Sequence, residues 1–487
     1  MLNKSKELFE AWNRNLINYH HWKSNEHLVE GLDGDTDLDV LISPANKKEG
    51  CAILHEIGFK PFHSQFGSRY PNVEDWIGFD KETGRLLHLH LHFSLMTGHK
   101  GLKEYELPWR EESLKTRILD EGTRVYIMNP NLELVTLYTR MILKSNGKTV
   151  RSAQKGSYKM DSHFLVEINY IKKRVEWRTV SEIANRYYGR HGEKFVELAK
   201  FKFLSSTQFL DLHKLVSSSM RKYSRYQGFS LSIRRSFYSN ILRLRYVCFH
   251  CFKCKFLSRK VANTQKGLTI AFVGQDGSGK STVTSDIIKW LTWKIDAQYF
   301  YLGSGDEHYY PWQKKMLKRA SNSKHVWNKA FRSWLLLSYY LASAKYVLRT
   351  IKQANNYANK GGIAIFDRYP QISFFGINDG PKIRTQLIER VPQKLRWLAG
   401  WYAKKEEQYL ERAVAIAPSL VFKLQLSPEE SLHRKPEEKR ETVIRKHEIV
   451  KALSFSSSKV YEIDAEQPYY DELLQIKKEI WQNISEL

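Results

Sequence analysis

A short stretch of the sequence combines glycines, a lysine and a serine at the spacing of a phosphate-binding loop. Residues 274–281 read Gly-Gln-Asp-Gly-Ser-Gly-Lys-Ser. In this pattern the glycines let backbone N–H groups turn toward a phosphate, the lysine reaches the β- and γ-phosphates, and the serine hydroxyl binds Mg²⁺. The sequence therefore predicts a site for ATP and Mg²⁺ rather than a glycine-rich turn without a ligand. Its expected members are Gly274, Asp276, Gly277, Ser278, Gly279, Lys280, Ser281 and Thr282.

The residues on either side supply the elements that this loop requires. Residues 268–273 are almost all apolar, as in a parallel strand that is buried on both faces. After the loop, apolar residues recur at Val283, Ile287, Ile288 and Leu291, the spacing of one helix face. Strand, loop and helix in this order are the context that the motif needs.

A second pair of charged residues follows another apolar run. Residues 363–366 read Ile-Ala-Ile-Phe and lead directly into Asp367 and Arg368. Ligands bind at the carboxyl edge of a parallel sheet, so we expect Asp367 to reach Mg²⁺ and Arg368 to bind a phosphate with two N–H groups. A surface ion pair at the end of a strand is the alternative. Further on, the basic segment that begins at Arg434 is typical either of a lid over phosphates or of a solvated charged helix.

Two acids near the N-terminus form a separate pattern. Residues 37–42 alternate acidic and apolar side chains at first, as a strand with one polar face does. Asp37 and Asp39 therefore point the same way and are close enough to share one hard cation. The alternative is a solvated acidic turn that follows a glycine. The preceding residues, 1–27, have the pattern of a helical segment.

Three histidines share one face of another predicted strand. Residues 87–93 read Leu-His-Leu-His-Leu-His-Phe, which places His88, His90 and His92 on one side. They are either metal ligands or a general base beside Asp37 and Asp39, or the polar face of a hairpin strand that follows the turn at 81–84.

The composition limits the class of protein. The chain has 487 residues, too many for one core, with 42% hydrophobic and 27% charged residues, which is ordinary for a globular protein. Its net charge of +26 implies anionic partners: nucleotides, nucleic acid, an acidic membrane surface or a phosphorylated glycan intermediate. The beginning of the chain lacks the apolar core of a signal peptide, and the four cysteines give no disulfide framework, so a reducing cytoplasm is expected.

The middle of the chain is basic. Residues 160–240 have the pattern of several helices, and residues 234–260 interleave Arg and Lys with aromatic residues. This stretch either lies on an anionic membrane or nucleic acid or is a linker helix that packs its aromatic side chains on a neighbour. Cys248, Cys251 and Cys254 lack the second half of a structural zinc site. We therefore divide the chain into residues 1–150, 151–260 and 261–487.

The second half resembles the thymidylate kinase family. The resemblance covers residues 267–487 and rests on the loop at 274–282, Asp-Arg-Tyr at 367–369, the arginine-bearing segment at 434–445 and Ile-Asp-Ala at 463–465. It implies that the chain phosphorylates dTMP or a related monophosphate with ATP. The residues expected to act are Lys280, Asp367, Arg368 and Arg434, with Ser281 and Asp367 binding Mg²⁺.

Residues 22–143 resemble the minimal nucleotidyltransferases, in particular a poorly characterised bacterial branch. Asp37 and Asp39 match the metal-binding acids of that family, and Ser24 matches the serine of its glycine–serine turn. Lys23 stands at the position of the glycine, and His90 or His92 stands where the family has a third carboxylate.

These observations predict an α/β protein with three parts. A parallel sheet flanked by helices carries the phosphate loop, an α+β nucleotidyltransferase-like domain precedes it, and a helical region lies between them. The expected function is an ATP-dependent phosphotransferase that uses nucleotide substrates. The alternatives are a kinase of a glycan intermediate in surface-polysaccharide biosynthesis and a membrane- or nucleic-acid-associated NTPase. A homodimer is compatible with the sequence.

Overall fold

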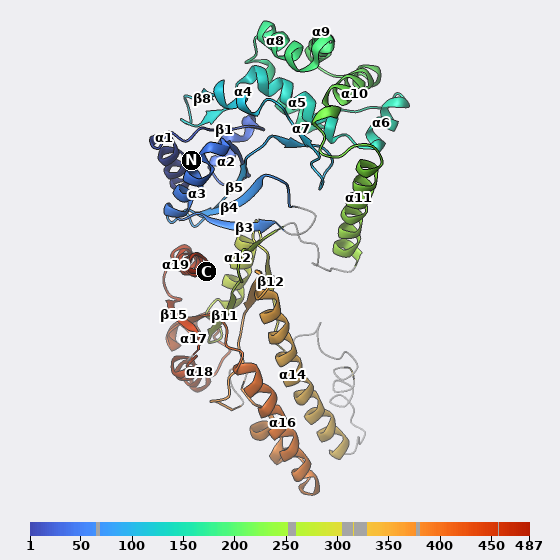
Figure 1. Ribbon diagram of the computed structural model, residues 1–487. Helices are drawn as coiled ribbons and strands as arrows, with labels where there is room; N and C mark the ends of the chain where they lie inside the picture. The colour runs from blue at the N-terminus through green and yellow to red at the C-terminus, as the bar shows by residue number, and fades with distance from the viewer. Residues whose placement is uncertain (65–68, 252–259, 304–314, 316–328, 376–379, 456) are drawn as a thin grey trace. The chain divides into compact units, whose positions relative to one another are not determined.

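The computed structural model describes residues 1–64, 69–251, 260–303, 315, 329–375, 380–455 and 457–487 (Figure 1). The chain divides into two compact units, Met1–Val261 and Ala262–Leu487. Each unit has its own sheet, and β10 (Val261–Asn263) lies at the boundary. None of the helices in the described ranges is both long enough and apolar enough to cross a bilayer.

The first unit is built on a mixed sheet. Among the strands that lie wholly within the unit, the order is β3-β4-β5-β2-β1-β9-β8. β4 and β5 form an antiparallel hairpin, whereas β2 runs parallel to β5 and antiparallel to β1. The strands are β1 (Tyr19–His21), β2 (Leu38–Ile42), β3 (Lys60–Ser64), β4 (Val73–Phe79), β5 (Leu86–His92), β8 (Ile118–Leu119) and β9 (Tyr126–Ile127), with β6 (Met96–Thr97) and β7 (Tyr105–Glu106) as a separate pair.

Helices enclose this sheet and continue into a helical layer. The expectation of a helix over residues 1–27 is wrong in its second half, because α1 ends at Arg14 and β1 follows. The helices are α1 (Asn3–Arg14), α2 (Leu28–Leu32), α3 (Lys47–Glu56), α4 (Arg110–Lys115), α5 (Pro130–Lys144), α6 (Gly147–Gln154), α7 (Ser162–Lys172), α8 (Trp177–Tyr188), α9 (Gly192–Lys200), α10 (Ser206–Met220) and α11 (Gly228–Cys251).

Helix α5 joins the sheet to the helical layer. It begins at Pro130 with Asn129 as its N-cap, whose side chain accepts a hydrogen bond from the Asn131 N–H. Nearly every residue of α5 is buried, because α7, α8 and α10 all pack against it. The hydroxyl of Tyr138 donates to the Ala199 carbonyl at 3.0 Å. One hydrophobic core therefore extends from α5 through α10.

The second unit has a parallel sheet, as the sequence predicts. Its strand order is β12-β13-β11-β14-β15, and each neighbouring pair is parallel. The strands are β11 (Thr269–Gly274), β12 (Ala297–Tyr299), β13 (Ile363–Phe366), β14 (Leu420–Gln425) and β15 (Lys459–Asp464). The helices are α12 (Lys280–Leu291), α14 (Lys329–Ala358), α15 (Ile383–Gln386), α16 (Arg396–Val414), α17 (Pro428–Arg434), α18 (Arg440–Ala452) and α19 (Tyr469–Glu486).

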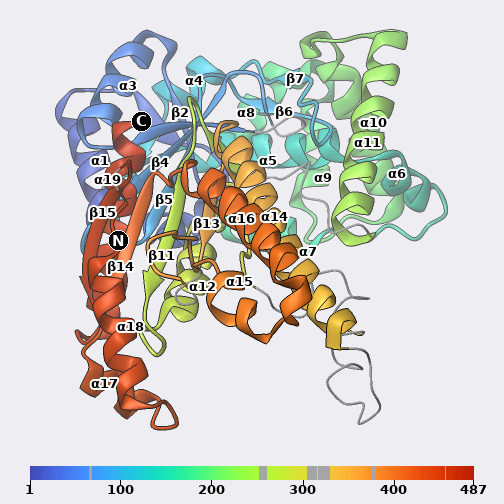
Figure 2. The same cartoon turned by 90° about the horizontal axis from the view of Figure 1, so that it is seen from below.

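The helices of this unit cover the sheet as a parallel sheet requires. Ala271 and Val273 of β11 pack into a core with residues of α14 and α16, and these two helices lie side by side (Figure 2). Ile270 and Phe272 alternate with them along β11 and are also fully buried. Helices α12 and α19 contact each other and the sheet.

The strand order indicates that a ligand would bind at the carboxyl end of β11. The chain passes from β11 to the edge strand β12, returns to β13 next to β11, and then crosses to β14 on the other side of β11. The direction of winding thus reverses at β11. In such sheets ligands bind outside the carboxyl ends of the strands at the point of reversal, and the carboxyl end of β11 is Gly274, where the phosphate loop begins.

Candidate functional site

The loop at 274–282 has the backbone of a phosphate-binding loop. It connects β11 directly to α12. Gly277 and Gly279 have φ of 84° and 80°, a conformation that favours glycine. A Cβ on Gly274 would lie 2.6 Å from the Ser278 Oγ, so the loop also turns back closely on itself. A Cβ on Gly279 would meet no atom within 4 Å, which shows that the loop beside the start of α12 faces open space.

Polar side chains of the loop bond to its own backbone and to the end of β14. The Lys280 ammonium donates to the Gly274 and Gln275 carbonyls, each at 2.7 Å. The Gln275 amide donates to the Leu426 carbonyl at 2.6 Å and so ties the loop to the end of β14. The Ser278 hydroxyl is buried and has no hydrogen-bond partner among the described residues. A phosphate oxygen would supply one. Ser281 and Thr282 are exposed in the first turn of α12.

The predicted lid residue Arg434 contacts the loop. Its guanidinium donates to the Gly277 carbonyl at 3.3 Å and to the Ala465 carbonyl at 3.1 Å. The Ser431 hydroxyl, one turn earlier in α17, donates to the Asp276 carbonyl at 3.0 Å. The structure therefore brings together three of the sequence features that lie far apart in the chain: the phosphate loop, the arginine segment and the Ile-Asp-Ala end of β15.

Asp276 is already paired with a cation of the same region. The Lys446 ammonium lies 2.5 Å from its Oδ2 and 3.0 Å from the Glu438 carboxylate. Burial alone would raise the pKa of Asp276, but the hydrogen bond and charge of Lys446 outweigh burial and the pKa lies below its usual value. Asp276 is thus a carboxylate that connects α18 to the loop.

Asp367 and Arg368 lie at the carboxyl end of β13, the strand next to β11. Asp367 is buried, and Arg368 is half-buried with its guanidinium 5.7 Å from the centre of the Tyr301 ring. Burial, followed by the Asp367 charge, raises the pKa of Tyr299. Arg368 also lines a pocket of about 60 Å³, together with residues of α14 and α16 and the Lys382 and Glu406 side chains.

Some predicted features fall outside the described residues. Cys254, one of the three clustered cysteines, is not described. Cys248 and Cys251 belong to α11, but their side chains lie outside the described part of the chain.

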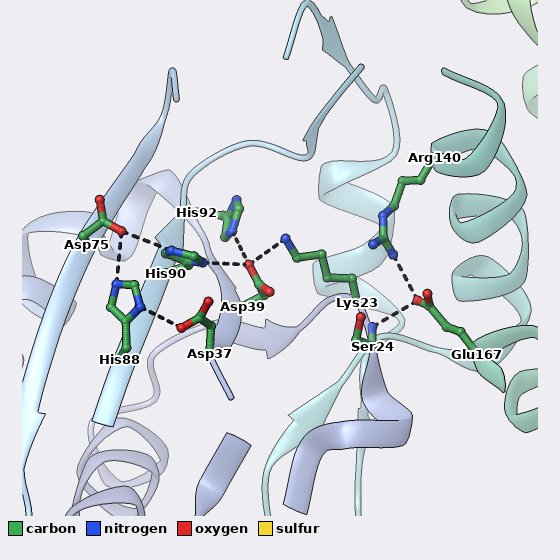
Figure 3. A network of polar contacts seen from close by, with 10 residues as sticks. All are labelled: Lys23, Ser24, Asp37, Asp39, Asp75, His88, His90, His92, Arg140 and Glu167. Atoms are coloured by element: carbon green, nitrogen blue, oxygen red, sulfur yellow. Dashed lines mark hydrogen bonds and ion pairs between the residues drawn. The ribbon is translucent and has the colours of Figure 1, made fainter. Parts of the chain in front are cut away.

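The first unit carries a second polar cluster, shown in Figure 3. In the strand register Asp39 of β2 lies opposite His90 of β5, which in turn lies opposite Asp75 of β4. The Asp39 Oδ1 is 3.3 Å from the His90 Nδ1 and 3.0 Å from the His92 Nε2. Asp39, His90 and His92 therefore form one group on β2 and β5, next to Asp75 of β4.

Asp75 completes this cluster and was not predicted from the sequence. Its Oδ1 lies 3.1 Å from the His90 Nε2 and 3.2 Å from the His88 Nε2, while the His88 Nδ1 is 2.7 Å from the Asp37 Oδ1. A hairpin that turns at 81–84 pairs residue 75 with residue 90. The predicted turn therefore contained the signal that locates Asp75.

The protonation of the cluster follows from its burial and its pairs. Burial would raise the pKa of Asp39 and Asp75, but Lys23 in the first case and His88 with His90 in the second outweigh it, and both pKa values are lowered. Burial also opposes protonation of His90, yet its bonds to Asp39 and Asp75 raise its pKa to about 10. His92 is different, because burial dominates and lowers its pKa to about 4.

The serine turn expected of a nucleotidyltransferase is engaged with side chains of the same unit. Ser24 has φ of 57°, and its N–H donates to the Glu167 Oε1 at 3.1 Å. The Arg140 guanidinium donates to the same oxygen at 3.1 Å, and the Lys23 ammonium lies 2.7 Å from the Asp39 Oδ1 (Figure 3). The Glu167 carboxylate thus accepts hydrogen bonds from both the Ser24 N–H and the Arg140 guanidinium.

More cations gather beside this turn. Burial, and then the charges of Lys23 and Arg140, lower the pKa of Lys103 to about 7. The charge of Arg140, and then burial, hold the pKa of Lys144 well below its usual value. Lys103 and Lys144 therefore give up their protons more readily than exposed lysines do.

The chain has recognisable relatives. It is similar to the uncharacterized ATP-binding protein YghR of Escherichia coli (strain K12), with 26% identity over 223 residues that make up 43% of this chain and 86% of YghR. It is also similar to the uncharacterized ATP-binding protein YghS of the same strain, with 28% identity over 232 residues, 44% of this chain and 92% of YghS. No protein-family model matches the chain.

Proposed function

We propose that the second unit binds ATP at residues 274–282 and transfers its γ-phosphoryl group to an acceptor held near Arg368. One observation carries this proposal. The glycine loop begins at the point where the strand order reverses, and Arg434 from a distant segment donates a hydrogen bond to the Gly277 carbonyl within the loop. The names of the similar proteins YghR and YghS, both described as ATP-binding, support the nucleotide part of the proposal.

Different residues of the site would bind the phosphates and the Mg²⁺ ion. Backbone N–H groups at the start of α12 and the Ser278 hydroxyl would bind phosphate oxygens, and Lys280 would move from the loop carbonyls to the β- and γ-phosphates. Ser281 and Asp367 are the residues that would hold Mg²⁺. The ion neutralises charge on the phosphates when it is bound. Arg434 is placed to stabilise the charge that develops on the transferred group.

The acceptor is best explained as a nucleoside monophosphate of the dTMP type. Phosphoryl transfer to an ionised phosphate needs clamping and positioning but no base. Arg368, beside the pocket at the end of β13, can bind such a phosphate with two N–H groups. A glycan hydroxyl would in addition require a general base next to it.

The test is transfer of labelled phosphate from ATP in the presence of Mg²⁺. The full chain is incubated with nucleoside monophosphates and, separately, with sugar acceptors, and Lys280→Ala is the control. Label in dTDP that is absent from the control supports the proposal. Label only in a sugar product replaces the acceptor class. Hydrolysis without transfer contradicts a kinase and favours an NTPase that works on a membrane or nucleic acid.

A further inference from the structure

We propose that Asp39, His90 and His92 in the first unit bind a divalent transition-metal ion of the Zn²⁺ type. This site is independent of the phosphotransferase proposed for the second unit. The three side chains come from two neighbouring parallel strands, β2 and β5, and their ligand atoms all lie within 4.8 Å of one another.

The donor atoms have the spacing that a small metal site requires. Ligands that sit 2.0–2.1 Å from a tetrahedral Zn²⁺ are about 3.3 Å apart. The Asp39 Oδ1 is 3.3 Å from the His90 Nδ1 and 3.0 Å from the His92 Nε2. Both histidine nitrogens face the same carboxylate oxygen, so the three donor atoms lie around one common position. Two imidazoles and one carboxylate leave a further position for a ligand.

A second carboxylate holds one of these histidines in the required orientation. The His90 Nε2 lies 3.1 Å from the Asp75 Oδ1. Metal-binding histidines usually donate their other ring N–H to a carboxylate, which fixes the orientation of the ring. Because Asp39 and Asp75 favour the protonated His90 ring, a metal on its Nδ1 must displace the proton there, and metal binding releases that proton. Asp75 is itself buried and also bonded to His88. The Asp75–His90 pair therefore supports the ring from the buried side of the cluster.

The same donors do not suit Mg²⁺. Magnesium binds oxygen ligands and retains water, whereas imidazole favours Zn²⁺ and its neighbours. The strand position opposite Asp39, where a third carboxylate would complete an oxygen site, is His90. The third acid of the cluster, Asp75, lies beyond His90 on β4, so the groups next to Asp39 are imidazoles, which favour a softer ion.

Lys23 competes with a metal at this site. Its ammonium lies 2.7 Å from the same Asp39 Oδ1 that both histidines face. The Lys23 side chain is 19% exposed, so its ammonium can move to solvent when an ion binds. A neutral residue of similar length at this position removes the competing charge, and we expect Lys23→Met to bind the metal more tightly.

The experiment is a Co²⁺ titration of the full chain, followed by visible d–d bands and by competition with Zn²⁺ and Mg²⁺. All four cysteines, Cys51, Cys248, Cys251 and Cys254, are first changed to Ser in every sample, so that thiolates cannot contribute. We expect one Co²⁺ per chain, displaced by Zn²⁺ and not by excess Mg²⁺. His90→Ala and His92→Ala should abolish the bands, and Asp75→Asn should weaken binding by about tenfold.

Two further variants make the assignment specific. His163→Ala, an exposed histidine of α7, is the matched control and should bind normally. His88→Ala distinguishes the neighbouring group of Asp37, His88 and His90, which also has suitable donors. Circular dichroism in chelator shows which variants are folded, and the gain in Lys23→Met does not depend on any loss of structure. Absent bands in the parent protein, bands that survive His92→Ala, or loss in His88→Ala with normal His92→Ala would each overturn the proposal.

Discussion

Single glycines decide whether the phosphate loop can form. Gly279 has φ of 80°, and a Cβ there would touch nothing within 4 Å. The cost of a side chain at this residue is therefore backbone strain of about 1–2 kcal/mol and not a collision. Strain of this kind is relieved by turning the peptide groups, and these are the groups that would bind phosphate.

We therefore expect Gly279→Ala to weaken ATP binding by about tenfold, which is 1.4 kcal/mol. Gly156→Ala is the matched control, because Gly156 has φ of 74° and equally open surroundings but lies in the first unit. Isothermal titration with ATP and Mg²⁺ measures both variants. Equal affinities in the two variants would mean that the loop backbone does not bind the nucleotide.

A buried acid of α5 makes the first unit sensitive to pH. Burial raises the pKa of Glu133 to about 8, and the charges of Glu167 and Glu26 add to the effect. The folded protein then holds a proton that the unfolded chain releases near pH 4.5. Stability is therefore complete below about pH 4.5 with respect to this group and falls as the pH rises to about 8.

Glu133→Gln removes this titration while it keeps the shape of the side chain. We expect the variant to be more stable than the parent at pH 8.5 by about 1–3 kcal/mol, with a much smaller difference at pH 5. Thermal unfolding at the two pH values measures the change. A parent protein whose melting temperature is the same at pH 5 and pH 8.5 would contradict the expected titration.

At the scale of elements, the local sequence pattern predicted several strands and helices correctly, but it did not predict which distant strands pair. The strand, loop and helix around Gly274 could be read from apolar spacing, and so could the hairpin that carries His90. Strand β1 could not, because three residues are too few to show a period. The pairing of β2 with β5 joins residues 51 apart and has no local signal, yet it alone places Asp39 beside His90. The hydrogen bond from the Ser24 N–H to Glu167 joins residues 143 apart, and the local sequence pattern did not predict it either.

The segment of α17 and α18 gives a prediction at this scale. Arg434 reaches two backbone carbonyls, of Gly277 and Ala465, from the end of α17. Its guanidinium is therefore already located over the phosphate loop. We expect Arg434→Ala to reduce kcat of phosphoryl transfer by about 10²-fold, with a smaller effect on ATP affinity.

Arg434→Lys separates charge from geometry in this experiment. Lysine retains the charge but not the planar pair of donors, so it should recover only part of the rate. Arg412→Ala, an exposed arginine of α16, is the matched control and should transfer phosphate normally. Unchanged kcat in Arg434→Ala would remove this residue from the reaction.

At the scale of the whole molecule, the two units have separate sheets and separate cores. Among the described residues, the cores around α5 and β2 draw their members from Met1–Val261, and the cores around β11 and α16 draw theirs from Ala262–Leu487. Each unit then has a hydrophobic core of its own, as a domain that folds independently does. The two proposed sites also lie in different units, so a ligand of one site stabilises one core directly.

Calorimetry of the full chain tests this division. ATP with Mg²⁺ at 100 times its Kd adds about 2.7 kcal/mol to the unit that binds it, which raises the melting temperature of a unit of this size by about 5–10 °C. We expect two transitions, of which one moves with nucleotide and stops moving in Lys280→Ala. The other should respond to Glu133→Gln and not to nucleotide. A single transition that shifts as a whole would show that the two units unfold together. A nucleotide-induced shift that persists in Lys280→Ala would show that ATP binds outside the loop.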